Sequence, residues 1–120
     1  MSVDWIEHKG KRILRADYRG CHTEEEMLQV LDEQGKQLRL RPVKTLLLSD
    51  FGGTAVGSAF MNEVKRRGAE SGDRLIEKNA VLGVTGLKGI LLDGFVAATG
   101  LKDRIRSFDN EADAMAWLVE

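Results

Sequence analysis

A short apolar run between Lys44 and Asp50, with three consecutive leucines at its centre, constrains the fold of this chain more than any other feature. Breaking residues flank the run, and such a run is typical of a strand that is buried on both faces of a mostly parallel sheet. A second run of this kind covers Ala80–Val84. Between and after the two runs, apolar residues recur at helical spacing. Strands that alternate with helices predict an α/β fold with right-handed parallel crossovers.

The segments before the first run predict a hairpin. Val3–His8 and Lys11–Tyr18 read as strands on either side of a Lys9-Gly10 turn, which we expect at an edge of the sheet. After the hairpin we expect a helix that is capped by Thr23 and ends near Arg41, followed by a strand over Lys44–Asp50. The next expected elements are a helix that is capped by Ser58 and resumes over Asp73–Lys78 after two glycines, and a strand over Ala80–Val84. The last are a helix over Leu87–Gly100, a strand over Arg104–Phe108 and a helix capped by Asp109 or Asn110. The predicted order is ββαβαβαβα, with a mostly parallel five-stranded sheet and four helices.

Length and composition limit the function classes. At 120 residues the chain is expected to form a single domain over 1–120, with enough buried surface for a proper core. The 18 basic and 19 acidic side chains give a net charge of -1, which argues against nucleic acid as the partner. The single cysteine excludes an internal disulfide, and no signal peptide or transmembrane segment is predicted, so we expect a cytoplasmic protein. The sequence predicts no cofactor and no metal site, because no metal-ligand spacing occurs.

Candidate binding residues follow from the predicted topology, because ligands of parallel sheets bind beyond the carboxyl ends of the strands. The residues that we single out there are Asp50, Gly53, Thr54, Ser58, Thr85, Gly86 and Lys88. Glycines in the loop after Asp50 permit close backbone approach, and the next helix start offers free amides to an anion. The spacing matches neither a Walker A loop nor a dinucleotide fingerprint, so a plain turn with a helix cap explains it equally.

Several roles stay open for these side chains. Asp50 could orient a ligand, act as an acid or base, or accept a hydrogen bond from a loop amide. Thr85 could cap a helix, and Lys88 could be a solvated charge rather than an anion ligand. A third loop carries Cys21 and His22, and the nearby helix start would favour a thiolate. Adjacent residues rarely form a catalytic pair, however, and no serine-nucleophile motif occurs. We therefore predict that the chain is not an enzyme.

Four segments together resemble the small bacterial STAS-like family, whose members are stand-alone domains with the anti-sigma-factor-antagonist fold. They are Gly10–Leu14, Leu46–Phe51, Ala80–Lys88 and Phe108–Leu118. The family is sometimes grouped with the lipid-binding CRAL-TRIO domains. The resemblance implies a non-enzymatic regulatory or binding module that acts through protein–protein interaction. The alternative that it leaves open is a carrier or sensor of a small molecule or lipid, bound at the loops after the central strands.

The resemblance also implies a role for one serine. In anti-sigma-factor antagonists, a partner kinase phosphorylates a serine at the start of the helix after the central strand, and the matching residue here is Ser58. The family's Asp-Ser-Ser-Gly signature is absent, because Gly57, Ser58 and Ala59 stand in its place. A phosphate would add up to about two negative charges to a binding surface and would be expected to reverse its electrostatics. Side chains such as Trp5, Phe60 and Phe95 would mark a homo-oligomer interface if they were exposed.

Overall fold

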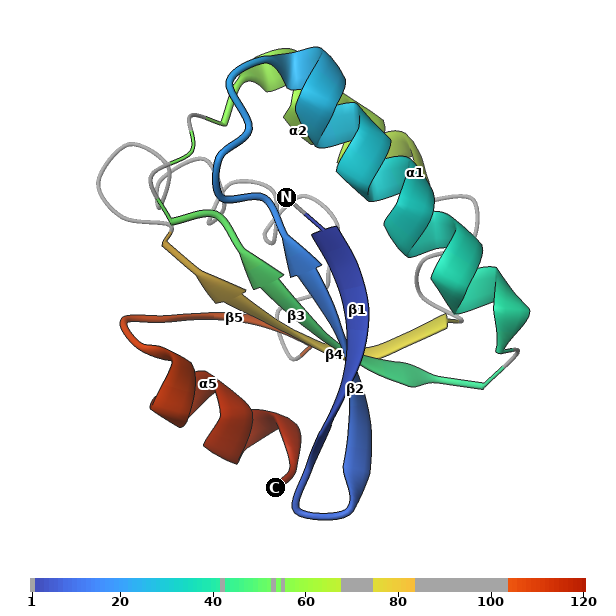
Figure 1. The fold of residues 1–120 in the computed structure, drawn as a ribbon, viewed down its shortest axis with the longest axis vertical. Helices are drawn as coiled ribbons and strands as arrows, with labels where there is room; N and C mark the ends of the chain where they lie inside the picture. The colour runs from blue at the N-terminus through green and yellow to red at the C-terminus, as the bar shows by residue number, and fades with distance from the viewer. Residues whose placement is uncertain (1, 42, 53, 55, 68–74, 84–103) are drawn as a thin grey trace.

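A computed structural model describes residues 2–41, 43–52, 54, 56–67, 75–83 and 104–120. Figure 1 shows the sheet at the centre of the molecule with helices on both sides. The elements are β1 (Ser2–His8), β2 (Lys11–Asp17), α1 (Glu24–Leu40), β3 (Thr45–Asp50), α2 (Ser58–Arg67), β4 (Ile76–Leu82), β5 (Ile105–Phe108) and α5 (Glu111–Leu118).

The sheet confirms the predicted α/β class. Its five strands lie in the order β1-β2-β3-β4-β5; β1 is antiparallel to β2, and the other neighbours are parallel. The strand in the middle is β3, as its apolar run predicts, and all six of its residues are buried. The described part of the chain contains three helices rather than the four expected, because the helix predicted over Leu87–Gly100 lies outside the described residues.

The opening hairpin forms at the predicted turn. Lys9 and Gly10 both have positive φ, at 50° and 79°, and they join His8 to its strand partner Lys11. Two consecutive residues of positive φ make a mirror-image turn, whose twist matches that of the two strands. Of the two hairpin strands, β1 is the edge strand, because β2 also pairs with β3 through the register that sets Ile13 beside Leu46. The prediction that the hairpin lies at an edge of the sheet is therefore confirmed.

Alternate residues of the strands face two different helical layers. On one face, Leu14 and Ala16 of β2, with Tyr18 directly after the strand, pack with α1 and α2, and on the other Ile13 packs with α5. In Figure 1, α1 and α2 lie together on one side of the sheet and α5 lies on the other. This two-sided cover explains why β3 is apolar throughout, since both of its faces are withdrawn from water.

The start of β4 differs from the prediction. The strand begins at Ile76 and ends at Leu82, instead of covering Ala80–Val84, so a helix cannot continue to Lys78. The first half of this strand contains the polar residues Glu77, Lys78 and Asn79, so the sequence there lacks the apolar run that indicates a buried strand. The ammonium group of Lys78 lies at the end of α5, where it donates a hydrogen bond of 2.8 Å to the carbonyl oxygen of Trp117. A long side chain can bury its stem while its charge reaches a polar partner.

The caps that the sequence predicts for α1 and α5 are present. Thr23 accepts a hydrogen bond from the amide of Glu26, and Asn110, not Asp109, accepts one from the amide of Asp113. The Glu26 carboxylate reaches back to the amide of His22, at 2.9 Å, one residue before the cap itself. Ser58 is the first residue of α2, and the carbonyl of Gly57 accepts the first helical hydrogen bond, from the amide of Met61. Gly57 therefore occupies the cap position, and the prediction that Ser58 caps this helix is wrong.

Candidate functional site

The structure describes three of the seven predicted site residues. Asp50 ends β3, Thr54 lies in the loop that follows, and Ser58 begins α2. The other four predicted residues, Gly53, Thr85, Gly86 and Lys88, lie outside the described residues. Asp50 therefore lies at the carboxyl ends of β2 and β3, the edge of the sheet at which the sequence predicts a site.

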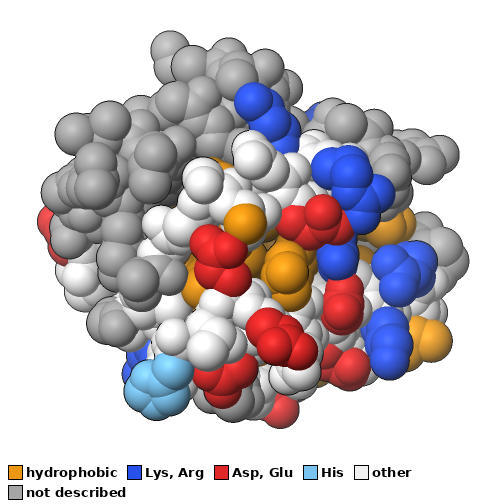
Figure 2. All heavy atoms as spheres, turned by 90° about the horizontal axis from the view of Figure 1, so that it is seen from above, with side chains coloured by type: hydrophobic (Ala, Val, Ile, Leu, Met, Phe, Trp, Pro, Cys, Tyr) orange, Lys and Arg blue, Asp and Glu red, His pale blue; other side chains and the backbone are white. Residues whose placement is uncertain are grey.

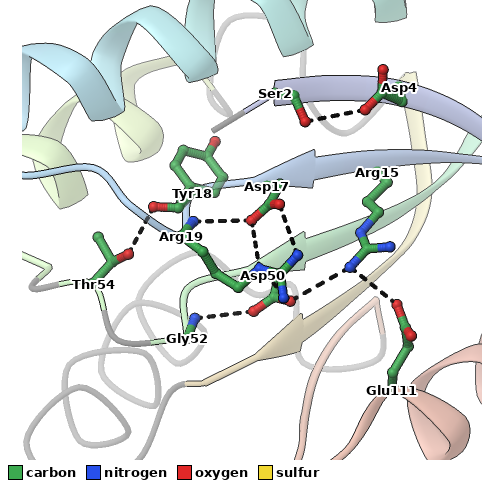
Figure 3. Close-up of polar contacts among 10 residues, drawn as sticks. All are labelled: Ser2, Asp4, Arg15, Asp17, Tyr18, Arg19, Asp50, Gly52, Thr54 and Glu111. Atoms are coloured by element: carbon green, nitrogen blue, oxygen red, sulfur yellow. Dashed lines mark hydrogen bonds and ion pairs between the residues drawn. The ribbon is translucent and has the colours of Figure 1, made fainter.

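The Asp50 carboxylate is held on both of its oxygens (Figure 3). Oδ1 accepts a hydrogen bond of 3.0 Å from the amide of Gly52, which is one of the three roles predicted for this side chain. Oδ2 lies 3.4 Å from Nε of Arg19 and 3.9 Å from Nη2 of Arg15. Because this side chain is only 11% exposed, these contacts replace most of its water. Asp50 therefore anchors the loop to the sheet.

A second carboxylate lies beside Asp50 in the neighbouring strand. The parallel register pairs Asp17 with Asp50, so both side chains leave the same face at the same edge. Arg19 binds Asp17 with two hydrogen bonds of 2.9 Å, which hold the pKa of that carboxyl below its usual value. Arg19 thus joins two carboxylates that would otherwise repel each other.

Arg15 extends the group to the last helix. Its Nη2 lies 3.3 Å from a carboxylate oxygen of Glu111, the first residue of α5. Its Nε is buried and has no hydrogen-bond partner in the described part of the chain. We call Arg15, Asp17, Arg19, Asp50 and Glu111 the Asp50 network. Of these five residues, only Asp50 is a predicted site residue. The alternation of Arg15 and Asp17 with apolar residues predicts a strand, but it does not show that their side chains meet Asp50.

The loop after Asp50 is fixed to the core. The hydroxyl of Thr54 donates a 2.7 Å hydrogen bond to the carbonyl of Tyr18, and its amide donates to the carbonyl of Phe51. The ring of Phe51 stacks on Tyr18 at 4.4 Å, and Phe60 of α2 meets both rings edge-on. Thr54 is only 1% exposed, and in this conformation it holds the loop in place. Its contact with a ligand stays a prediction.

Of the three predicted site residues that the structure describes, Ser58 is the exposed one. It follows Gly57, where a Cβ would overlap the carboxylate of Glu24 at the start of α1. The first turn of α1 carries Glu24, Glu25 and Glu26, and Figure 2 shows acidic side chains gathered on this end of the molecule. A phosphate on Ser58 would therefore add to an acidic surface. The effect of such a phosphate on the electrostatics of a binding surface stays a prediction.

Cys21 and His22 do not form an activated pair. Cys21 is buried, and desolvation, followed by the nearby charge of Glu26, raises the pKa of its thiol. His22 is exposed at the position before the α1 cap. The helix start therefore does not produce the thiolate that it would be expected to favour.

Thiol labelling tests this assignment. A raised pKa leaves less thiolate at neutral pH, so we expect Cys21 to react with a disulfide reagent at least about tenfold more slowly than the same cysteine in the unfolded chain. The rate would be measured by absorbance at pH 7, in buffer and then in denaturant. A faster reaction in the folded protein would contradict the assignment.

No known protein family and no curated protein matches this chain in sequence comparison. Among the described residues, no helix has the length and apolar character needed to cross a membrane. The same residues contain no group of three or more metal-ligating side chains.

Proposed function

We propose that this chain is a STAS-like, non-enzymatic module of the cytoplasm that binds a protein partner through the surface at the start of α2. In this proposal, residues 87–100 supply the fourth helix of the STAS-like fold. The observation that carries the proposal is the exposed position of Ser58 at the start of α2, directly after a loop that is anchored to the core. Thr54 and Asp50 hold that loop through the hydrogen bonds described above. A fixed surface loses little conformational entropy when a partner binds.

The Asp50 network favours binding over catalysis. A general base needs a free lone pair directed at its substrate. Here both oxygens of Asp50 already face donors, namely the Gly52 amide and the guanidinium groups of Arg15 and Arg19. Arrangements of this kind are common in structural ion-pair networks, which position loops without reacting.

Phosphorylation of Ser58 would regulate such a surface. The phosphate would meet the free amides of the first turn of α2, which favour an anion. It would also face the Glu24 carboxylate, which lies close to Gly57. The added negative charge would weaken the binding of an acidic partner and strengthen the binding of a basic one, so the modification would select between partners.

The test is native mass spectrometry of protein purified gently from its host, as the wild type and as Ser58→Ala and Ser58→Asp. We expect a protein partner to copurify with the wild type and with Ser58→Ala. Ser58→Asp should change the affinity for that partner by about tenfold, the size of a moderate interface effect. The same spectra report the number of subunits and therefore test the homo-oligomer expectation.

Lys65→Glu provides the control, because Lys65 is an exposed residue near the other end of α2. It should leave the affinity unchanged. A small molecule that copurifies at constant stoichiometry, with no protein partner, would instead support the carrier alternative. An affinity equal in all variants would place the binding surface elsewhere.

A further inference from the structure

Two arginines lie over one tryptophan at the opposite end of the sheet from the Asp50 network. The guanidinium carbons of Arg12 and Arg41 are 4.8 Å and 5.2 Å from the ring centroid of Trp5. The ring is fixed by a hydrogen bond of 2.9 Å from its Nε1 to the side chain of Gln37 in α1. Arg41 caps the end of that helix one turn later. The arrangement holds two guanidinium groups against one ring, and neither forms an ion pair with a described carboxylate.

Further basic side chains continue this surface along the connection from α1 to β3. Arg39 and Lys44 are both exposed, and the strand register sets Thr45 close to the level of Arg12. None of these four cations, Arg12, Arg39, Arg41 and Lys44, makes an ion pair in the described residues, whereas Arg15, Arg19, Arg66 and Arg67 all do. Glu7 is the strand partner of Arg12, but it forms no such pair there.

Two large apolar side chains lie among these cations. Leu40 is 72% exposed and Val43 is 55% exposed, and they are the exposed large hydrophobic residues of the described chain. In the sequence they alternate with Arg39, Arg41 and Lys44. We call the surface formed by Arg12, Arg39, Leu40, Arg41, Val43 and Lys44 the basic edge. Leu40 and Val43 are exposed to water on this surface, whereas no other large hydrophobic side chain of the described residues is exposed.

We propose that the basic edge docks on a membrane surface that contains anionic phospholipids. Leu40 and Val43 would enter the boundary between headgroups and acyl chains, and the four cations would face the lipid phosphates. Guanidinium groups suit this role because their donors match phosphate oxygens in pairs. The proposal does not rest on the proposed function, since it concerns the other end of the sheet and a different class of partner.

The composition of the basic edge favours lipid over an acidic protein segment. A specific protein interface buries about 800 Å² on each partner and is usually centred on aromatic anchors in well-packed pockets. Here the one aromatic ring, Trp5, is half-buried and already covered by Arg12 and Arg41. Isolated aliphatic side chains between cations need no pocket, because a bilayer surface adapts to them.

The test is sedimentation of the intact protein with vesicles of phosphatidylcholine alone or of phosphatidylcholine and phosphatidylserine in equal parts. We expect binding to the anionic vesicles only, and weaker binding as salt rises. Lys44→Glu should weaken it by about thirtyfold, since each unit of charge near such a surface changes the affinity about fivefold. Lys65→Glu is the matched control, because it makes the same change of charge at an exposed lysine of α2.

A paired variant, Leu40→Ser with Val43→Ser, separates lipid insertion from simple charge attraction. Both side chains are exposed, so the variant should fold normally, which a thermal melt would check. It should lose at least about tenfold in affinity for the anionic vesicles. Undiminished vesicle binding by this variant, displacement of the protein by polyglutamate or inorganic phosphate, or an equal loss in Lys65→Glu would each overturn the proposal. Displacement by polyglutamate would indicate an acidic protein segment as the ligand, and displacement by inorganic phosphate would indicate a free phosphate.

Discussion

Replacing Gly83 by alanine should lower the free energy of unfolding by about 3 kcal/mol or more, because two penalties coincide at this position. Gly83 directly follows β4 and has a φ of 78°, a backbone conformation that residues other than glycine rarely adopt. A Cβ there would lie 2.6 Å from the Cα of Gly52 and 2.8 Å from the carbonyl carbon of Phe51. These neighbours are backbone atoms and cannot rotate away, so the loop or the strand end must move.

Gly20→Ala separates the two penalties. Gly20 has a φ of 88°, but a Cβ there would meet no atom within 4 Å. It should cost only about 1 kcal/mol, the price of the backbone conformation alone. Chemical denaturation of the wild type and both variants would measure the difference. Equal effects at the two glycines would show that the close approach of Gly83 to the loop is not a tight constraint.

The contact at Gly83 also explains how β4 positions the candidate site. The amide of Phe51 donates a 2.8 Å hydrogen bond to the carbonyl of Leu82, next to the place where Gly83 approaches Gly52. The loop after β3 is therefore fixed from β4 as well as from the core. Gly83→Ala should disturb the Ser58 surface without changing any residue of it.

Features that depend on local sequence could be predicted. The apolar run of β3, the Lys9-Gly10 turn and the Thr23 cap each follow from interactions within a few residues, and the structure contains all three. The start of β4 could not be predicted in this way. Its polar residues resemble an exposed helix, and only the end of α5, distant in the sequence, provides a partner for Lys78.

The candidate site shows the same limit. Sequence position alone placed Asp50 at the carboxyl end of a central strand, where the structure has it. Its partners depend on strand register, which sets Asp17 beside it and brings Arg15 and Arg19 within reach. No short motif encodes that register, since it results from how both helical layers pack on the sheet. Part of the basic edge is visible in the sequence, where Arg39, Arg41 and Lys44 form a basic cluster that is typical of a solvated face. That Arg12 of the hairpin lies near this cluster could not be predicted, because the contact joins β2 to the distant end of α1 through Trp5.

Asp50→Ala should lower the free energy of unfolding by about 2 to 3 kcal/mol, and the cause is the charge that it leaves behind. The carboxylate faces Arg15 and Arg19 and accepts the hydrogen bond of the Gly52 amide. Arg19 is half exposed and can return to water, but Arg15 is mostly covered, with a side chain that is 27% exposed. Loss of Asp50 would leave Arg15 with Glu111 alone and would free the loop after β3.

Two further variants make this result informative about the role of Asp50. Asp50→Asn keeps an oxygen for the Gly52 amide but removes the charge, so it should cost less than alanine and still at least about 1 kcal/mol. Asp4→Ala is the control, because Asp4 is an exposed aspartate whose carboxylate accepts a bond from Ser2, and it should stay within about 0.5 kcal/mol of the wild type. Stability would be measured by denaturation at pH 7. If Asp50→Asn and Asp50→Ala were as stable as the wild type, Asp50 would not be an anchor, and its burial between two arginines would require a functional explanation such as ligand binding or acid–base chemistry.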